Sequence, residues 1–414
     1  MAQSHESTQY YIDLEERYGA HNYHPLDLVI AEAKGVWVTD VEGRRYLDGL
    51  AAYSALNQGH GHPRILQTLI GQAAKVTLTS RAFRNTELPL LEKELCELTG
   101  LPEARMLPMN SGAEAVETAI KAARRWGYRK KGIAEGEALI IACADNFHGR
   151  TTTLVSFSTE PSYRDGYGPF TPGFVTIPFG DIDALQKVLT ESGHRTCAFL
   201  VEPIQAEAGV HIPPDGFLKQ AAALCREHNV LLMLDEIQTG LGRTGKMFAC
   251  EHDGVKPDAL ILGKALSGGF YPVSAVVARG EMLEVFEPGS HGSTFGGNPL
   301  GCAVARTALR VLVEEDLVAR SARLGAAFVD RLQTLQGPQI KEIRGRGLLI
   351  GIELRTKARP YCEALARAGV LCKETHDTVL RFAPPLIITE EELAWAFDRL
   401  APVLTSDTAA LAAA

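Results

Sequence analysis

Two apolar runs in this chain each lead into a charged residue, and this feature constrains the fold more than any other. Residues 230–234 are followed by Asp235, and residues 259–262 are followed by Gly263 and then Lys264. Short runs without polar alternation are typical of strands that helices cover on both faces, as in a parallel sheet. Because ligands bind beyond the carboxyl ends of such strands, the sequence predicts that Asp235 and Lys264 share one site at that edge of the sheet.

The two charged residues favour pyridoxal phosphate (PLP) as the occupant of that site. Lysines usually lie on the surface, but the apolar strand before Lys264 and the glycines after it leave little room for a solvated side chain. Burial would lower the pKa of its amine and make it nucleophilic, as a Schiff-base lysine must be. A strand-end aspartate is most often a helix cap or a solvated charge, but near a pyridine nitrogen Asp235 would keep that nitrogen protonated and strengthen the ring as an electron sink. Ile237 would face the same way as Asp235 and could pack on the ring.

The rest of the pattern predicts an α/β fold with two domains, as the length of 414 residues also suggests. Residues 54–304 alternate helical and apolar strand patterns, which predicts a large domain with a mainly parallel sheet between helices. Residues 305–414 are typical of a smaller α+β domain, with a strand near 348–354. Residues 1–53 contain a hairpin pattern and are expected to pack with the smaller domain. The alanine-rich tail at 409–414 is expected to fray.

Charge and cysteine content exclude several classes of protein. The formal net charge of −8 gives no electrostatic reason to expect a nucleic acid or an anionic membrane as partner, and no stretch has the ~18 apolar residues of a membrane span. Residues 1–16 lack the apolar core of a secretory signal, and the 8 cysteines are scattered without a CxxC pair. We therefore expect a cytoplasmic enzyme with reduced thiols. No metal is expected, because His60 and His62 have no third ligand and are interpreted as turn residues.

Residues 240–246, GLGRTGK, could be mistaken for a nucleotide-binding loop. The motif satisfies GxGxxG, comes close to GxxxxGK[ST] and follows a strand pattern. However, Met247 stands where a Ser or Thr would hold Mg²⁺, and no amphipathic helix follows before Pro257. Without a helix N-terminus a phosphate group loses its main binding site. The sequence therefore predicts a turn here.

A better phosphate site precedes the helical pattern that begins near Ala113. The small residues at 111–113 would leave backbone N–H groups and the positive end of the helix dipole facing an anion. Ser111 could equally act only as the N-cap of this helix. A PLP lysine elsewhere in the chain favours the phosphate interpretation.

Further residues with useful chemistry follow other predicted strands. Phe147 and Arg150 come shortly after the strand that ends near Cys143. Phe147 could fill the core or stack on an aromatic cofactor, and Arg150 could be a surface cation or a bidentate clamp for a carboxylate. Glu202 and Glu207 lie at the end of another strand. The residues alone leave these alternatives open.

Taken together, these segments resemble the class III (subgroup II) PLP-dependent aminotransferases, from about Tyr18 to Leu404. The ordered match from Asp235 to Gly269 is the most specific part. Within the family the likeness is greatest to the branch that acts on ornithine. That likeness rests on residues 18–25, 53–60, 76–83, 291–299 and 381–386. The resemblance implies PLP fold type I and a homodimer whose active sites lie at the subunit interface.

The resemblance also implies how PLP is held. Lys264 would carry the cofactor and move the proton, and Asp235 would hold the pyridine nitrogen. Phe147 and Ile237 would pack on opposite faces of the ring. The residues implied to bind the cofactor are Ser111, Gly112, Ala113, Phe147, Asp235, Ile237, Gln238, Lys264 and, from the other subunit, Thr294.

For the reaction, the resemblance implies transfer of the δ-amino group of L-ornithine to 2-oxoglutarate, giving glutamate 5-semialdehyde and glutamate. Tyr23 and Arg150 would hold the α-amino and α-carboxylate groups of ornithine, and Tyr53 would shape the pocket. Arg381 would bind the near carboxylate of 2-oxoglutarate. Glu207, counted with the catalytic residues, would pair with Arg381 and mask it until 2-oxoglutarate arrives.

Several alternatives compete with this function. A related enzyme could act on N-acetylornithine, 4-aminobutyrate or lysine, although Tyr23 and Tyr53 favour ornithine. An amino-acid racemase on the same fold would need no keto-acid acceptor. A non-catalytic protein that has kept the fold is disfavoured by the intact Lys264 and Asp235. The chain has His148 where some relatives have Trp, a departure that leaves the chemistry unchanged.

Overall fold

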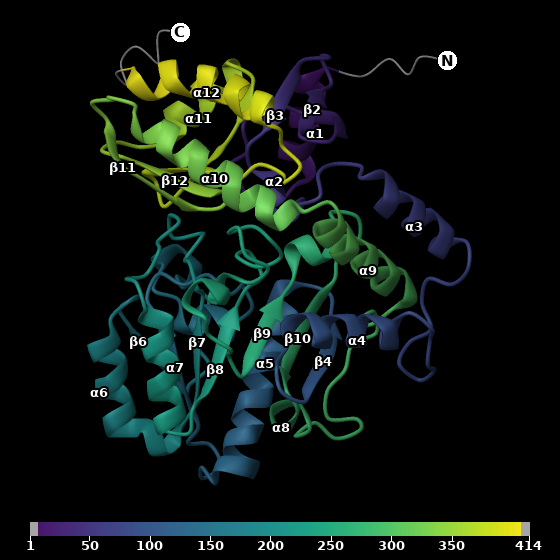
Figure 1. Cartoon of the computed structure of the whole chain (residues 1–414), viewed down its shortest axis with the longest axis vertical. Coiled ribbons are helices and arrows are strands. Elements are labelled where there is room, and N and C mark those ends of the chain that lie inside the picture. The colour runs from purple at the N-terminus through teal and green to yellow at the C-terminus, as the bar shows by residue number, and fades with distance from the viewer. Residues whose placement is uncertain (1–6, 407–414) are drawn as a thin grey trace.

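The computed structural model describes residues 7–406 and has two layered parts (Figure 1). The tail at 409–414 lies outside the described residues. The larger part is built on a 7-stranded sheet of order β4-β10-β9-β8-β7-β5-β6. Its strands are β4 (Ala104–Met109), β5 (Leu139–Cys143), β6 (Phe174–Ile177), β7 (Thr196–Val201), β8 (Leu231–Asp235), β9 (Ala259–Leu262) and β10 (Ser274–Arg279). β6, β5, β7, β8 and β9 pair in parallel, and β10 is antiparallel to both of its neighbours, so the mainly parallel sheet is confirmed.

Helices cover both faces of this sheet, as the apolar strands require. These helices are α3 (Pro63–Ala73), α4 (Leu88–Thr99), α5 (Gly112–Trp126), α6 (Ile182–Ser192), α7 (Phe217–Glu227), α8 (Gly280–Leu283) and α9 (Pro299–Glu314). Alternate side chains of each strand enter two different hydrophobic cores. In β8, Met233 enters the core that includes α5, while Leu232 and Leu234 enter the core that includes α4, α7 and α9.

The C-terminal part contains an antiparallel sheet of order β11-β12-β15-β14. Its elements are α10 (Leu317–Gln333), β11 (Ile340–Arg346), β12 (Leu349–Leu354), α11 (Arg359–Arg367), β13 (Val370–Leu371), β14 (Lys373–Thr375), β15 (Val379–Phe382) and α12 (Glu390–Thr405). The strand predicted near 348–354 is present as β12, but β11 beside it was not predicted. β11 lies at the edge of the sheet and carries four charged residues in its IKEIRGR sequence, so it lacks the apolar signal of a strand.

The N-terminal segment joins the C-terminal part through a small sheet. It consists of α1 (Thr8–Tyr18), β1 (Ile30–Lys34), β2 (Trp37–Asp40) and β3 (Arg45–Asp48). β2 and β3 form the expected hairpin, and β3 pairs in parallel with β13. The indole of Trp37 donates to Glu392 Oε1 at 2.8 Å and packs edge-on against Trp395. The domain boundaries at 53 and 304 stay a prediction.

Residues 240–246 form consecutive turns, as the sequence predicts, and only a short 3-10 helix at Ala249–Asp253 follows them. Within residues 7–406, every helix is too short or too polar to cross a bilayer. In the same range, no three His, Cys, Asp or Glu side chains lie together as metal ligands.

Candidate active site

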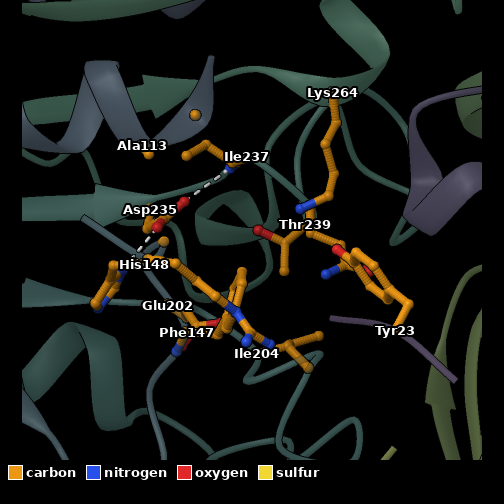
Figure 2. A pocket seen from close by; sticks show the side chains of 14 residues that line it. Tyr23, Ala113, Phe147, His148, Glu202, Ile204, Asp235, Ile237, Thr239 and Lys264 are labelled. Carbon is orange, nitrogen blue, oxygen red and sulfur yellow. Dashed lines mark hydrogen bonds and ion pairs between the residues drawn. The ribbon is translucent and has the colours of Figure 1, made fainter. Parts of the chain in front are cut away.

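A cavity of about 450 Å³ opens where the parallel strands of the large sheet end (Figure 2). The loops after β5, β7, β8 and β9 and the start of α5 form its walls. The candidate site residues that line it are Tyr23, Gly112, Ala113, Phe147, Arg150, Asp235, Ile237, Gln238 and Lys264. The structure therefore brings most of the proposed cofactor residues, which are far apart in sequence, to one cavity.

Lys264 extends into this cavity from the turn that follows β9 (Figure 2). Its side chain is only partly exposed, and burial lowers the pKa of its amine. The negative charges of Glu207 and Asp235 act in the other direction and raise this pKa, but the effect of burial is larger. The residue has a φ of 42°, in the left-handed region that non-glycine residues rarely adopt. A lowered pKa and a strained backbone are both typical of a functional amine held in one position.

Asp235 ends β8 and is held by two contacts (Figure 2). Its Oδ1 accepts the backbone N–H of Ile237 at 3.1 Å, and its Oδ2 lies 2.7 Å from Nδ1 of His148. Both side chains are buried, and Nε2 of His148 has no partner among the described residues. Each carboxylate oxygen can accept a further hydrogen bond, so Asp235 can still receive an N–H from a ligand while His148 fixes its orientation.

The start of α5 forms one end of the cavity, where the sequence predicts a phosphate site. Ser111 is the N-cap: its hydroxyl accepts the N–H of Glu114 at 3.2 Å, and the Glu114 carboxylate accepts the N–H of Ser111 at 2.8 Å. The capping interpretation of Ser111 is thus correct for its side chain. The next two N–H groups, of Gly112 and Ala113, are left for an anion. A Cβ atom at Gly112 would lie 2.9 Å from Cδ1 of Ile237, so only glycine fits between the helix and this side chain.

An ion pair between the buried Arg381 and the partly buried Glu207 lies beside the cavity. Glu207 Oε1 accepts a hydrogen bond from Nη1 of Arg381 at 2.7 Å and another from Gln238 Nε2 at 2.9 Å. Burial alone would raise the pKa of Glu207, but the charges of Arg381 and Lys264 outweigh it and lower the pKa to about 2. Arg381 is 1% exposed, and its guanidinium lies 5.6 Å from the ring centroid of Tyr53. The pairing that the resemblance implied for Glu207 and Arg381 is therefore present in the structure.

Tyr53 reaches Arg381 from a left-handed turn. Four consecutive non-glycine residues, 51–54, have positive φ between 48° and 69°. Oδ1 of Asp48 accepts the N–H groups of Leu50 and Ala51 at 2.9 and 2.8 Å, and Oδ2 lies 2.7 Å from His60. A run of left-handed residues is unfavourable for L-amino acids, so these contacts hold the turn in place.

Arg150 lies at the other side of the cavity among aromatic rings. Its guanidinium is 4.0 Å from the ring centroid of Tyr163 and 5.6 Å from that of Phe147, and the two rings meet edge-on. No hydrogen bond or ion pair joins Arg150 to another of residues 7–406, so its N–H groups are available to a carboxylate. Tyr23 stands at the rim and is 67% exposed.

Several lining residues were not predicted as site residues: His148, Gly149, Glu202, Ile204 and Thr239. Glu202 is buried and accepts the N–H of Phe147 at 3.1 Å. Burial and then the charge of Asp235 raise the pKa of Glu202 well above its usual range, which favours its protonated form. The position of Glu202 at a strand end was a usable signal, whereas Ile204 and Thr239 carried none. Thr294, in contrast, is exposed and does not line this cavity.

These residues fit PLP. The helix start offers free N–H groups for a phosphate, Asp235 offers an acceptor for a pyridinium, and Phe147 and Ile237 offer apolar surfaces. Two buried polar atoms, Nε2 of His148 and Oε1 of Gln238, have no partner among the described residues, as expected beside a polar ligand. Together the fold and the site define a PLP-dependent enzyme of fold type I. The sequence model of the family Aminotransferase class-III matches residues 18–404, and the chain belongs to that family.

Individual relatives are similar over almost the whole chain. The ornithine aminotransferase of Brevibacillus brevis is 60% identical over 397 residues, which covers 96% of this chain and 98% of the relative. The ornithine aminotransferase of Bacillus subtilis is 58% identical over 393 residues, with 95% and 97% covered. A structure of the Toxoplasma gondii ornithine aminotransferase, described with partial occupancy of PLP, has a TM-score of 0.94 and 46% identity and covers 97% of this chain and 94% of its own. The acetylornithine aminotransferase of Elizabethkingia anophelis has a TM-score of 0.88 and 49% identity, with 96% and 99% covered.

Proposed function

We propose that this chain is an ornithine aminotransferase that moves the δ-amino group of L-ornithine to 2-oxoglutarate with PLP as cofactor. The products are glutamate 5-semialdehyde and glutamate. The observation that carries the proposal is the ion pair of Glu207 and Arg381 beside Lys264. A cation that can be either masked or free suits an enzyme that takes a basic amino acid first and a dicarboxylate second.

The chain's own residues divide the work of proton transfer. When bound, PLP supplies an aldehyde that takes up the amino group and a ring that accommodates the electron pair left on the substrate carbon. Asp235 holds a proton at the pyridine nitrogen, and His148 keeps this carboxylate oriented. The amine of Lys264 would take the proton from the substrate carbon that bears the transferred nitrogen and would deliver it to the cofactor side, so that the nitrogen stays with PLP. The N–H groups of Gly112 and Ala113 hold the phosphate.

Substrate orientation follows from the positions of the cations. The free guanidinium of Arg150 binds the α-carboxylate of ornithine, and Tyr23 contacts the α-amino group. Glu207 cancels the charge of Arg381, so the α-carboxylate has no competing cation near Lys264. The δ-amine is thereby the group that reaches the cofactor.

The second substrate needs the opposite arrangement. 2-Oxoglutarate must present its keto carbon to Lys264, which places its near carboxylate at Arg381. Glu207 then moves away, and the guanidinium of Arg381 can bind this carboxylate in a bidentate manner. The far carboxylate lies toward Arg150.

We also propose a cytoplasmic homodimer, with domains at 1–53, 54–304 and 305–414. Three large apolar side chains are exposed: Ile70 by 56%, Phe83 by 73% and Phe295 by 47%. Ile70 lies on α3, Phe83 lies in the loop after α3, and Phe295 is next to Thr294 in the sequence. Such exposure supports a face covered by a second copy, and Thr294 of the partner subunit would then complete the phosphate site. Light scattering coupled to size exclusion tests the dimer, and a monomer that is active at assay concentration would refute the shared site.

One rival substrate has direct support, because the acetylornithine aminotransferase of Elizabethkingia anophelis is 49% identical to this chain. The test uses the purified holoenzyme and follows the visible absorbance of its bound cofactor. L-Ornithine should remove this absorbance at low concentration, and 2-oxoglutarate should restore it. N-Acetylornithine, 4-aminobutyrate and L-lysine serve as competitors, and Lys264→Ala as the inactive control. Bleaching by N-acetylornithine at lower concentration than by ornithine would reject the proposal, and turnover without any keto acid would indicate a racemase.

A further inference from the structure

Arg243 is the buried charged group that the proposed reaction does not use. It lies in the turns at 240–246 that follow β8, and its side chain is 0% exposed. Its Nη1 donates to the backbone oxygens of Leu348 at 3.0 Å and Pro384 at 2.6 Å, and its Nη2 donates to Oδ1 of Asn57 at 2.5 Å. One guanidinium thus joins the large sheet's loop to two segments of the C-terminal part.

Every acceptor of Arg243 is neutral. Among residues 7–406, no carboxylate forms an ion pair with it, and its Nε has no hydrogen-bond partner. Burial lowers the pKa of Arg243 to about 9, so it still carries its charge at neutral pH. The negative charge of Asp48 opposes this lowering of the Arg243 pKa, but Asp48 already pairs with His60 at 2.7 Å. A buried charge without a counter-ion is unfavourable, which calls for a reason to retain it.

The position of Arg243 relative to Arg381 supplies that reason. Arg381 lies in β15, and the hydrogen-bonded oxygen of Pro384 belongs to the segment directly after this strand. The same segment is also fixed by the Leu386 N–H, which donates to the backbone oxygen of Asn57 at 2.8 Å. The charges of Arg243 and Arg381 are close enough to act on one another. Arg243 therefore holds the segment that directly follows the strand of the cation proposed to receive 2-oxoglutarate.

We propose that Arg243 is the permanent cation of the keto-acid subsite, a residue that acts through Arg381 and favours a dicarboxylate acceptor. Glu207 cancels the charge of Arg381 while ornithine is bound, but Arg243 forms no ion pair with any carboxylate among residues 7–406. When Glu207 moves away, two positive charges act on the incoming carboxylate. The inference rests on the proposed function, because it assigns Arg381 to the keto acid.

The test changes the charge at or beside Arg243 without touching Arg381. Asn57→Asp replaces the accepting amide oxygen by a carboxylate and so neutralises Arg243 in place. Asn57→Ser is the matched control, because it loses the same amide donor to Leu241 without adding a charge. Arg243→Met removes the charge, and Arg243→Lys retains it. Two unit charges about 10 Å apart, at an effective dielectric constant of about 20, change a binding constant roughly tenfold.

The two half-reactions are measured separately on the holoenzyme by the absorbance of the bound cofactor. Asn57→Asp and Arg243→Met should raise the 2-oxoglutarate concentration for half-maximal rate about tenfold. The ornithine concentration for half-maximal rate should change by less than about twofold in these variants. Arg243→Lys should recover most of the affinity for the keto acid. Equal losses in both half-reactions, or a loss in Asn57→Ser as large as in Asn57→Asp, would show a purely structural residue and overturn the inference. If one substitution prevents folding, the other charge-removing variant decides. A wild-type enzyme that ornithine does not bleach would refute the proposed function instead.

Discussion

Replacing Glu207 by glutamine should direct the enzyme toward α-amino acids. The carboxylate of Glu207 is held 2.7 Å from Arg381, and its pKa is about 2 rather than 4.5. This difference corresponds to ~3 kcal/mol of preferential stabilisation of the charged form. A substrate carboxylate that needs Arg381 must first displace this interaction. Its removal could therefore improve binding by at most about 300-fold.

We expect a smaller gain, of about tenfold, for two reasons. Lys264 contributes part of the attraction on Glu207, and a glutamine amide oxygen can still accept from Arg381. L-Glutamate, which presents its α-amino group, should thus react at about tenfold lower concentration in the Glu207→Gln enzyme. Ornithine should also begin to react through its α-amine, because its α-carboxylate can now reach Arg381.

The assay is a single-turnover reaction of the holoenzyme with L-glutamate or L-ornithine, followed by mass spectrometry of the products. Arg381→Met and the double variant complete a double-mutant cycle. The gain from Glu207→Gln should disappear when Arg381 is absent. Unchanged glutamate affinity in a variant that folds normally, or a gain that persists without Arg381, would refute the masking of Arg381 by Glu207.

The remaining predictions concern neighbouring groups. His148→Leu should weaken PLP retention about tenfold, because a charge-assisted hydrogen bond to Asp235 is lost; dialysis of holoenzyme measures the retention, and retention equal to wild type would contradict this prediction. Tyr163→Leu should raise the ornithine KM about tenfold by removing the ring under Arg150, and it should also raise the 2-oxoglutarate concentration that restores the absorbance, because Arg150 is proposed to bind a carboxylate of each substrate. Tyr163→Phe should match wild type because the phenol hydroxyl has no hydrogen bond to the described residues. Glu207 has a folded pKa of about 2, below its unfolded value, so its stabilising contribution is present above pH 4.5 and is lost as the pH falls toward 2. The free energy of unfolding, measured by denaturation, should therefore depend less on pH in Glu207→Gln than in wild type over that range. An equal pH dependence in the two proteins would count against the ion pair.

The strands of the large sheet could be predicted because they are apolar on both faces. β8 and β9 differ from their predicted bounds by at most one residue, and their charged ends, Asp235 and Lys264, meet in one cavity. This meeting follows from parallel strand order alone, since both residues end strands at the same edge. In β11 the pattern fails, because an edge strand with charged side chains does not differ from a loop in composition.

Contacts between distant polar residues could not be derived from composition or spacing. His148 and Asp235 are 87 residues apart, and Glu207 and Arg381 are 174 residues apart. The resemblance to a family supplied the second pair, but for His148 it noted only a difference from some relatives. For residues 240–246 the predicted turn is correct, but nothing in the sequence indicated that the side chain of Arg243 is among the most buried in the described chain. A charged side chain is buried only where three-dimensional neighbours satisfy it, and the local sequence carries no record of them.

The charges of the site explain why one pocket can serve two substrates of opposite net charge. Ornithine is a cation and 2-oxoglutarate a dianion, so an unmasked cation in direct contact with the substrate would favour one half-reaction at the expense of the other. Glu207 is only partly buried, and its carboxylate is held by hydrogen bonds to Arg381 and Gln238, which a carboxylate ligand can replace one for one. The pair is therefore neutral toward ornithine and becomes cationic only when an acid of the right length displaces Glu207. The permanent cation of Arg243 lowers the free energy of that displaced state. The burial of Arg243 without an ion-pair partner therefore serves the selection of the acceptor rather than the stability of the fold.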